Sequence, residues 1–308
     1  MKIGIPRSIF YYQYSGHFIK FFNLLGIETV ISPVTNDSIF KYGKDNMIDE
    51  LCLPLKVLAG HTVYLKEMGI SKIFLPVIIG NKSQDSFLCF NQIRSYDIIR
   101  NSGISPKNSI LTGTFYYQNN ELMEGGFYEI GEKLGYSWNK VEQALTRLKE
   151  LSEYKNEGQI YENKSNLTIG LAGRSYVVED KWINNNLKQT LRKMGCRMIT
   201  EKSYNFNRVE KAAHFTQTGK VIKTITRMNE DDKINGIIYL IPFNCGPDCS
   251  IELTVKNQVL SKPFIKLVID EAQGQAGLIT RVEAFLDIIQ LKRKESASCS
   301  SVLLKTDI

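Results

Sequence analysis

The chain has 308 residues, enough for two domains of ordinary size. Its composition, 43% hydrophobic and 23% charged, is typical of a globular protein. It contains no run of about 20 apolar residues that could span a bilayer. The net charge of +7 comes from scattered basic residues, which argues against a nucleic-acid-binding face. The first residues lack the apolar core of a signal peptide, so a cytoplasmic location is expected.

The first half of the chain alternates predicted strands and helices. Helices are expected at 15–25 and 54–68, because apolar residues recur at helical spacing and a glycine follows each segment. Short apolar runs predict strands at 2–6, 28–32 and 72–76. The polar segment 150–166 is expected to be a linker or the frayed end of the preceding helix.

The second half repeats this alternation. Strands are expected at 167–172, 197–200, 236–241 and 263–269. One helix is predicted by the apolar stripe Trp182, Ile183, Leu187, Leu191 and Met194. The last helix is predicted by the stripe Leu278, Ile279, Val282, Phe285, Leu286 and Ile289, and from about Ser296 a ragged tail is expected.

Both halves open with a similar pattern of strand, Arg-Ser turn, helix, glycine and strand. The first half reads IGIPRS and later LLGIETVIS, and the second reads IGLAGRS and later KMGCRMIT. Internal duplication of one unit explains this similarity. We therefore predict an α/β fold with two Rossmann-like parallel-sheet lobes and a functional site in the cleft between them. The expected division is 1–150, 167–290 and a tail at 291–308.

Three cysteines fall in loops where an α/β fold gathers its ligands. Cys52 precedes Pro54, a favourable first helical residue, so a helix N-terminus should stabilise its thiolate. Cys89 follows the predicted strand at 72–76, and Cys245 follows the strand at 236–241. Since cytosolic thiols stay reduced, such cysteines indicate a metal or redox site between the lobes.

Other interpretations of the cysteines stay open at this point. Buried cysteines can simply pack as small apolar groups, and we expect this of Cys196. A structural zinc site is the rival metal assignment, because Cys245 and Cys249 are separated by three residues. Cys299 lies in the expected tail and is interpreted as incidental.

Two further residues are candidates for acid–base or hydrogen-bonding roles. His61 follows Gly60 in the predicted helix at 54–68, and Glu271 stands at the carboxyl end of the predicted strand at 263–269. The sequence has neither a P-loop nor a GxGxxG fingerprint, so intrinsic ATP or NAD binding is not indicated.

Five blocks in order resemble the proteins related to activators and subunits of 2-hydroxyacyl-CoA dehydratases, a group that includes double-cubane cluster proteins. The resemblance runs from Lys2 to about Gln290. The blocks are IGIPRSIFYYQY, DELCLPLKVLAGH around Cys52, FLCFNQIRSYDIIR around Cys89, FNCGPD around Cys245, and IDEAQGQAGLITRVEAFLD.

The resemblance implies a 4Fe-4S cluster held by Cys52, Cys89 and Cys245, with one iron open to substrate or solvent. It also implies a separate ATP-hydrolysing activator protein that donates low-potential electrons. A double cubane would need more thiolates than these three unless chains share ligands. Further candidate partners are a second copy of the chain or a different partner subunit. The candidate substrate is an acyl-CoA or another small molecule.

The sequence departs from the family pattern at polar positions. Phe90 replaces the usual proline after Cys89, and Arg174 and Ser175 stand in a block that usually reads Gly-His-Pro-Tyr. The block 270–277 lacks a His and a Glu, and Cys249 replaces a serine. The cysteines that would bind the cluster are retained, whereas polar groups that could act on a substrate are changed. The departures therefore put dehydratase chemistry in doubt more than cluster binding. If Cys249 is a fourth ligand, the closed cluster would favour electron transfer over catalysis.

Three functional hypotheses follow. The first is an iron–sulfur protein that transfers low-potential electrons or reduces a small substrate with an ATP-dependent activator. The second is a 2-hydroxyacyl-CoA dehydratase subunit, a lyase that uses the open iron. The third is a non-catalytic cluster carrier within a larger assembly.

Overall fold

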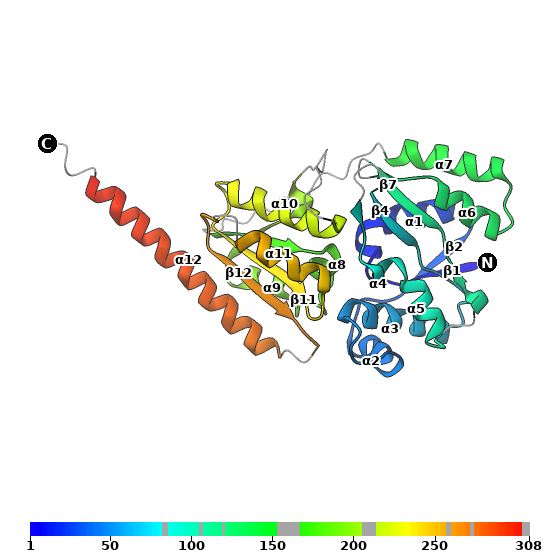
Figure 1. The fold of residues 1–308 in the computed structure, drawn as a ribbon, viewed down its shortest axis with the longest axis horizontal. Helices are drawn as coiled ribbons and strands as arrows, with labels where there is room; N and C mark the ends of the chain where they lie inside the picture. The colour runs from blue at the N-terminus through cyan, green and yellow to red at the C-terminus, as the bar shows by residue number, and fades with distance from the viewer. Residues whose placement is uncertain are drawn as a thin grey trace.

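A computed structural model describes residues 1–81, 86–104, 107–118, 121–152, 167–204, 214–256, 260–271 and 274–303. The chain forms two α/β lobes side by side, with a long C-terminal helix extending away from the second lobe (Figure 1). The strands of the first lobe fall within 1–150 and the described strands of the second within 167–290. The α/β prediction with two Rossmann-like lobes is thereby confirmed.

The first lobe is built on a parallel sheet with the order β2-β1-β3-β6. Its strands are β1 (Lys2–Ile5), β2 (Glu28–Ile31), β3 (Lys72–Phe74) and β6 (Ile110–Leu111). The accompanying helices are α1 (Tyr11–Leu24), α2 (Asp37–Asn46), α3 (Leu53–Glu67) and α7 (Trp138–Ser152). Helix α1 begins four residues before the predicted start, and α2 was not predicted from the sequence.

A second sheet in the first lobe was not predicted from the sequence. It has the order β5-β4-β7-β8, with β4 (Val77–Asn81), β5 (Ser86–Phe87), β7 (Thr114–Gln118) and β8 (Glu121–Leu122). It continues the first sheet, because Leu75 N donates to Leu111 O at 2.9 Å and Val77 N to Gly113 O at 3.0 Å. The short elements around it are α4 (Phe90–Ile93), α5 (Ser95–Asn101), η2 (Lys107–Ser109) and α6 (Gly125–Lys133).

The second lobe repeats the strand order of the first. Its parallel sheet has the order β10-β9-β11-β12. In both main sheets, the first strand in the chain lies between the second strand, at the sheet edge, and the third strand. The strands are β9 (Leu167–Gly173), β10 (Cys196–Thr200), β11 (Gly236–Pro242) and β12 (Phe264–Ile269). This shared order supports the predicted internal duplication.

The helices of the second lobe include α10 (Thr216–Glu230) and α11 (Gly246–Lys256), which were not predicted, and they differ from the prediction around Trp182. The other helices are α8 (Ser175–Glu179), α9 (Leu187–Lys193), η3 (Glu201–Ser203) and α12 (Gln275–Leu303). Trp182 and Ile183 were expected in a helix, but they lie in turns before α9. The cause is Asp180, whose Oδ1 accepts hydrogen bonds from both of their backbone N–H groups at 2.9 and 3.1 Å.

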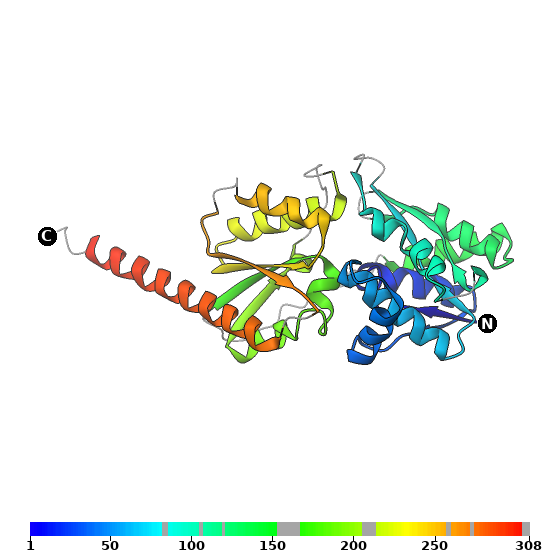
Figure 2. The same cartoon turned by 60° about the horizontal axis from the view of Figure 1, so that its bottom comes forward.

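Helix α12 corrects a second expectation. The ragged tail predicted from Ser296 is helical as far as Leu303, consistent with the absence of Gly and Pro between Leu278 and that residue. The predicted apolar stripe is confirmed, since Leu278, Val282, Phe285, Leu286 and Ile289 are buried. The far half of the helix projects beyond the lobe (Figure 2). Across the described ranges, no helix combines the length and apolar character that crossing a membrane requires.

Helices α2 and α3 are in direct backbone contact. A Cβ atom added at Gly60 would lie 1.9 Å from the carbonyl oxygen of Ile39, and one at Gly43 would lie 1.8 Å from that of Lys56. Only glycine permits so close an approach. This contact fixes α3, whose N-terminal cap is Cys52. The predicted linker at 150–166 lies outside the described residues, except for its first three, which end α7.

Candidate functional site

Each of the three predicted cysteines stands immediately before a helix. Cys52 caps α3, Cys89 caps α4, and Cys245 precedes Gly246, the first residue of α11. All three side chains are half-buried and none forms a disulfide. The unpaired N–H groups and the dipole of a helix N-terminus favour a thiolate over a thiol. The sequence prediction for Cys52 needs one refinement, since α2 separates it from strand β2.

The charges felt by these side chains show that the cysteines converge from both lobes. Burial raises the pKa of Cys52, the nearby Cys89 raises it further, and Arg174 lowers it. Burial likewise raises the pKa of Cys245 to about 12, against an opposing effect of Arg174. Tyr176, whose pKa is raised by burial, also responds to both Cys52 and Cys245. Cys52 and Cys245 therefore share Arg174 and Tyr176 as neighbours, and Cys89 lies near Cys52.

This place in the fold is a topological switch point of the second lobe. Strands β9 and β11 are neighbours in the sheet, while the chain between them passes through β10 on the other side. Arg174 follows β9 and Cys245 follows β11. Open α/β sheets bind ligands in the crevice at such carboxyl ends. The elements that carry the cysteines, α3, α4 and α11, face this boundary (Figure 1).

A buried ion pair at this point was missed by the sequence analysis. Arg174 Nε lies 2.9 Å from both carboxylate oxygens of Asp248, and Arg174 Nη2 donates to Oδ1 at 2.7 Å. The two side chains are 1% and 0% exposed. Arg174 also donates to Thr218 Oγ1 at 3.4 Å. The pair ties the turn after β9 to the first helical turn after Cys245. The available sequence signal was an arginine directly after a buried strand.

The donor chemistry fits an anionic iron–sulfur group. Iron–sulfur clusters are held by cysteine thiolates, and here three thiols stand at helix N-termini, two of them near a buried guanidinium. The ligands of a cluster bind different iron atoms, so they need not converge on one point. In the described ranges, no three His, Cys, Asp or Glu side chains are grouped to hold a single metal ion. The zinc alternative thus has no preformed single-ion site in this part of the chain. The role of the three cysteines as ligands remains a prediction.

Beside the cysteines lies a buried amide with an unused hydrogen-bonding atom. Gln92 stands one helical turn after Cys89 in α4, and its Nε2 donates to the hydroxyl of Tyr176 at 3.3 Å. Its Oε1 is buried and has no partner among the described residues. Buried polar atoms are normally satisfied, so this atom indicates a partner that the described residues do not supply.

His61 lies in a different network, at the boundary between the lobes. It is fully buried, and its Nε2 is 3.0 Å from Thr35 Oγ1, which donates to Asp180 Oδ2 at 2.5 Å. Tyr12 donates to the same oxygen at 2.8 Å. Since the Thr35 hydroxyl proton goes to Asp180, His61 Nε2 must be the donor in its contact with Thr35. Burial and the nearby Arg7 lower the pKa of His61 to about 3, so it is neutral.

Glu271 makes an ion pair instead of facing a cavity. Its Oε2 lies 3.1 Å from the Nζ of Lys56, a buried lysine of α3 that also donates to Asp49 O at 2.8 Å. This contact joins the two lobes. Neither His61 nor Glu271 has a cysteine among its hydrogen-bond or ion-pair partners, so their catalytic roles stay untested predictions.

The remaining cysteines separate by environment. Cys196 is buried in β10, which confirms its assignment to the core. Cys249 is exposed and lies one turn after Cys245, with its N–H donating to the Cys245 carbonyl at 3.2 Å. Its service as a fourth ligand stays a prediction. Phe90, the replacement for the family proline, is 70% exposed beside Cys89. The side chain of Cys299 lies outside the described part.

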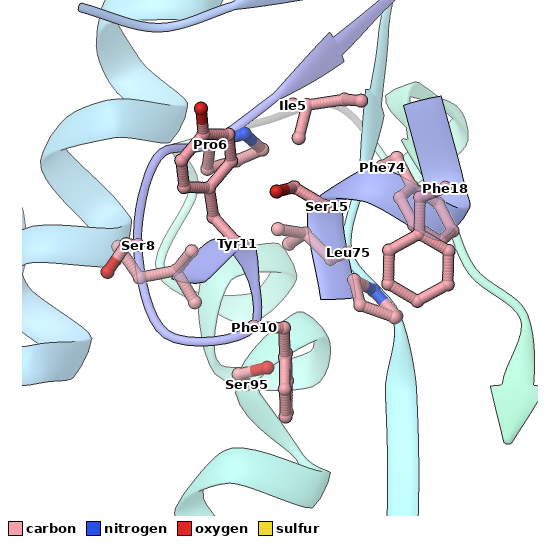
Figure 3. A pocket seen from close by; sticks show the side chains of 12 residues that line it. Ile5, Pro6, Ser8, Phe10, Tyr11, Ser15, Phe18, Phe74, Leu75 and Ser95 are labelled. Atoms are coloured by element: carbon pink, nitrogen blue, oxygen red, sulfur yellow. The ribbon is translucent and has the colours of Figure 1, made fainter. Parts of the chain in front are cut away.

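Two cavities bear on the choice of function. A cavity of about 200 Å³ lies between the lobes, walled by Tyr12 and Gln13 of α1 and by the carboxyl ends of β9 and β10. At the equivalent switch point of the first lobe, the space is only about 20 Å³ and is filled by aromatic side chains, with Ser95 beside it (Figure 3). A space of that volume is large enough for one water molecule and too small for a substrate.

The fold and the site define a two-lobed α/β protein with thiols gathered at the lobe boundary. The chain belongs to the family described as CoA enzyme activase uncharacterised domain, whose sequence pattern matches residues 2–204. The match includes Cys52, Cys89 and Arg174, whereas Cys245 lies beyond it. The activase-related part of the predicted resemblance is thereby confirmed, and the family relates the chain to the activation of CoA enzymes.

The other comparisons are distant. No curated protein matches the chain. A LacI family transcriptional regulator from Arthrobacter sp. FB24, in complex with lactose, shows a TM-score of 0.21 and 9% identity, covering 85% of this chain and 76% of that one. Another LacI family regulator, from Bifidobacterium animalis subsp. lactis, shows a TM-score of 0.20 and 9% identity over 86% and 76% of the two chains. Similarities at this level carry no argument about function.

Proposed function

We propose that this chain is an iron–sulfur protein that carries low-potential electrons for a CoA enzyme. Cys52, Cys89 and Cys245 would bind a 4Fe-4S cluster at the boundary between the lobes. The observation that supports this proposal is that two half-buried thiols from different lobes, Cys52 and Cys245, share one buried arginine, and that the half-buried thiol of Cys89 lies near Cys52. When bound, the cluster supplies one-electron chemistry at a potential that charge, hydrogen bonds and exposure set.

The residues of the chain prepare this site in two ways. The N-termini of α3 and α11 favour the charged form of Cys52 and Cys245. Arg174 places a positive charge behind the thiolates, and its bidentate bonds with Asp248 hold that charge in position. Burial opposes thiolate formation, as the raised pKa of Cys245 shows. The site therefore suits thiols that are deprotonated by binding a metal group.

The proposed partners follow from what the chain carries and from its family. The sequence has no P-loop, so ATP would be hydrolysed by a separate activator protein that donates electrons. Membership of the activase family suggests an acyl-CoA dehydratase as the protein that benefits from those electrons. Exposed Cys249, one turn from Cys245, would close the site if it served as a fourth ligand.

A second candidate function is catalysis on a small substrate, as in a 2-hydroxyacyl-CoA dehydratase subunit or a reductase. The observation that favours it is the cavity of about 200 Å³ between the lobes. This cavity is smaller than typical ligand pockets of about 300–1,000 Å³, so it suits only a very small molecule. This function needs an open iron, so it requires that Cys249 does not bind the cluster.

Anaerobic purification with iron and acid-labile sulfide assays tests the leading proposal. Wild-type protein should hold about four iron and four sulfide per chain, and Cys52→Ser, Cys89→Ser and Cys245→Ser should each lose most of that iron. Cys196→Ala is the matched control, because this buried cysteine belongs to the core. A colourless wild-type protein whose iron stays near zero after reconstitution would overturn the proposal.

Two additional measurements separate the candidate functions. If Cys249→Ser leaves the iron content and the visible spectrum unchanged, the cluster is open and catalysis is favoured. Acyl-CoA additions should then change the spectrum of the reconstituted protein. If the variant instead loses iron or alters the spectrum, a closed electron carrier is favoured.

A further inference from the structure

The amide of Gln92 is a buried group near the cysteines with an unused hydrogen-bonding atom. Its Nε2 lies 3.3 Å from the Tyr176 hydroxyl, while its Oε1 is buried without a partner among the described residues. Tyr176 and Gln92 are both buried, so bulk water does not supply the missing partner. A buried polar atom left in this state costs about 1–3 kcal/mol.

Rotating the amide by half a turn reveals which partner is missing. Oxygen and nitrogen exchange places with almost no change in shape, so the hydrogen-bond network must decide between the two orientations. In the rotated form the Tyr176 hydroxyl donates to Oε1, which satisfies both oxygen atoms. The two N–H groups of Nε2 then lie where Oε1 finds no donor among the described residues, and there they need an acceptor. This orientation therefore suits a bound group that presents hydrogen-bond acceptors.

The position of Gln92 indicates what that acceptor is. Gln92 is three residues after Cys89 in α4, so both lie on one side of the helix. Its partner Tyr176 responds to the charges of Cys52 and Cys245. The amide therefore stands where the three cysteines converge. An anionic group held by three thiolates would present sulfur acceptors at this point.

We propose that Gln92, oriented by Tyr176, donates an amide N–H hydrogen bond to the iron–sulfur group held by Cys52, Cys89 and Cys245. This inference rests on the proposed function. Gln92 acts as a positioning and tuning residue: its N–H stabilises the more negative, reduced form and so raises the reduction potential. In this role Tyr176 is not a metal ligand; its hydroxyl fixes the orientation of the Gln92 amide.

The test compares Gln92→Leu with Asn184→Leu in the full chain. Asn184 is also a buried amide, but its bonds are internal: it donates to the carbonyls of Val177 and Val178 at 2.9 Å. In the metal-free protein, Gln92→Leu should change the melting temperature little, because it removes the unsatisfied Oε1 and at the same time leaves the Tyr176 hydroxyl without its partner. Asn184→Leu should lower it. A structural role for Gln92 predicts a similar fall in both variants.

A redox titration of the reconstituted proteins provides the second readout. Gln92→Leu should lower the reduced-to-oxidised ratio at a fixed potential by about tenfold, equivalent to about 59 mV for one electron. Tyr176→Phe should shift the potential in the same direction by less, and Asn184→Leu should leave it unchanged. A Gln92→Leu protein with the iron content and the potential of the wild type would overturn this inference and leave the proposed function intact. Absence of iron from the wild type would instead overturn the proposed function itself.

Discussion

In the first lobe, the helix that carries Cys52 is held by backbone contact, whereas in the second lobe an ion pair holds the turn that carries Cys245. Helix α3 rests on α2 through Gly60 and Gly43, with no side chain between them. Helix α11 is held through Asp248, to which Arg174 donates hydrogen bonds from Nε and Nη2 along one edge of its guanidinium. The difference shows that two sheets with the same strand order can position cysteines by unrelated interactions.

The equivalent arginines of the two lobes make the same point. Arg7 and Arg174 occupy matching places after β1 and β9. Arg7 is partly exposed: its Nε donates to Ser32 O at 3.2 Å, and its guanidinium lies 4.9 Å from the ring centroid of Tyr11. Arg174 is buried and paired with a carboxylate. One position of the repeated pattern therefore serves local packing in the first lobe and the candidate site in the second.

The largest expected effect separates these two arginines. Arg174→Met leaves the carboxylate of Asp248 buried and unpaired, which should lower the free energy of unfolding by about 3–5 kcal/mol. Arg7→Met removes a partly exposed contact and should cost about 1 kcal/mol or less. Urea denaturation of the two metal-free variants measures the difference. Equal losses would show that burial of the ion pair does not distinguish the lobes.

The glycine contact of the first lobe predicts an intermediate effect. Gly60→Ala places a methyl group against the backbone of α2, so the helices must separate, at a cost of about 1–3 kcal/mol. Gly16→Ala is the matched control, since Gly16 also lies in a helix but has open space around its Cβ position. That control should keep or raise stability by up to about 1 kcal/mol. Melting curves that rank the two variants the other way would contradict the close packing.

The smallest expected effect concerns the link between the lobes. The pKa of His61 is about 3 in the folded chain, below its usual 6.5. Between these values the unfolded chain binds a proton that the folded chain excludes, so stability falls as the pH drops below about 6.5. From about pH 6.5 to about pH 5.5, wild-type protein should lose about 1 kcal/mol more than His61→Gln, measured by urea denaturation. Parallel losses in the two proteins would show that His61 titrates normally.

Much of the architecture could be predicted because the strands are short apolar runs between turn residues. Strand β11, for example, is buried along its whole length and reads as an uninterrupted apolar segment. The same reasoning failed at Trp182, where apolar spacing suggested a helix. The spacing of apolar residues does not take account of the Asp180 carboxylate, which accepts hydrogen bonds from the backbone N–H groups of Trp182 and Ile183 and stabilises a turn there.

The cysteines of the candidate site could be predicted from the sequence, but the contacts of Arg174 and Gln92 beside them could not. Loop position and the family resemblance both selected Cys52, Cys89 and Cys245. The partner of Arg174 lies 74 residues away along the chain, and that of Gln92 lies 84 residues away. Such pairs form because β9 and β11 are neighbours in the sheet and because the two lobes are in contact. These are features of the tertiary structure, and no local sequence pattern indicates them.

Helix α12 is a long helix that projects from the second lobe. It has 29 residues, so its axis extends for about 44 Å. One half packs on the second lobe, and the other half reaches into solvent (Figure 2). When a rigid body rotates, its most distant point travels the longest arc. A change in the angle between the lobes too small to resolve at Cys245 would therefore be magnified at the far end of this helix.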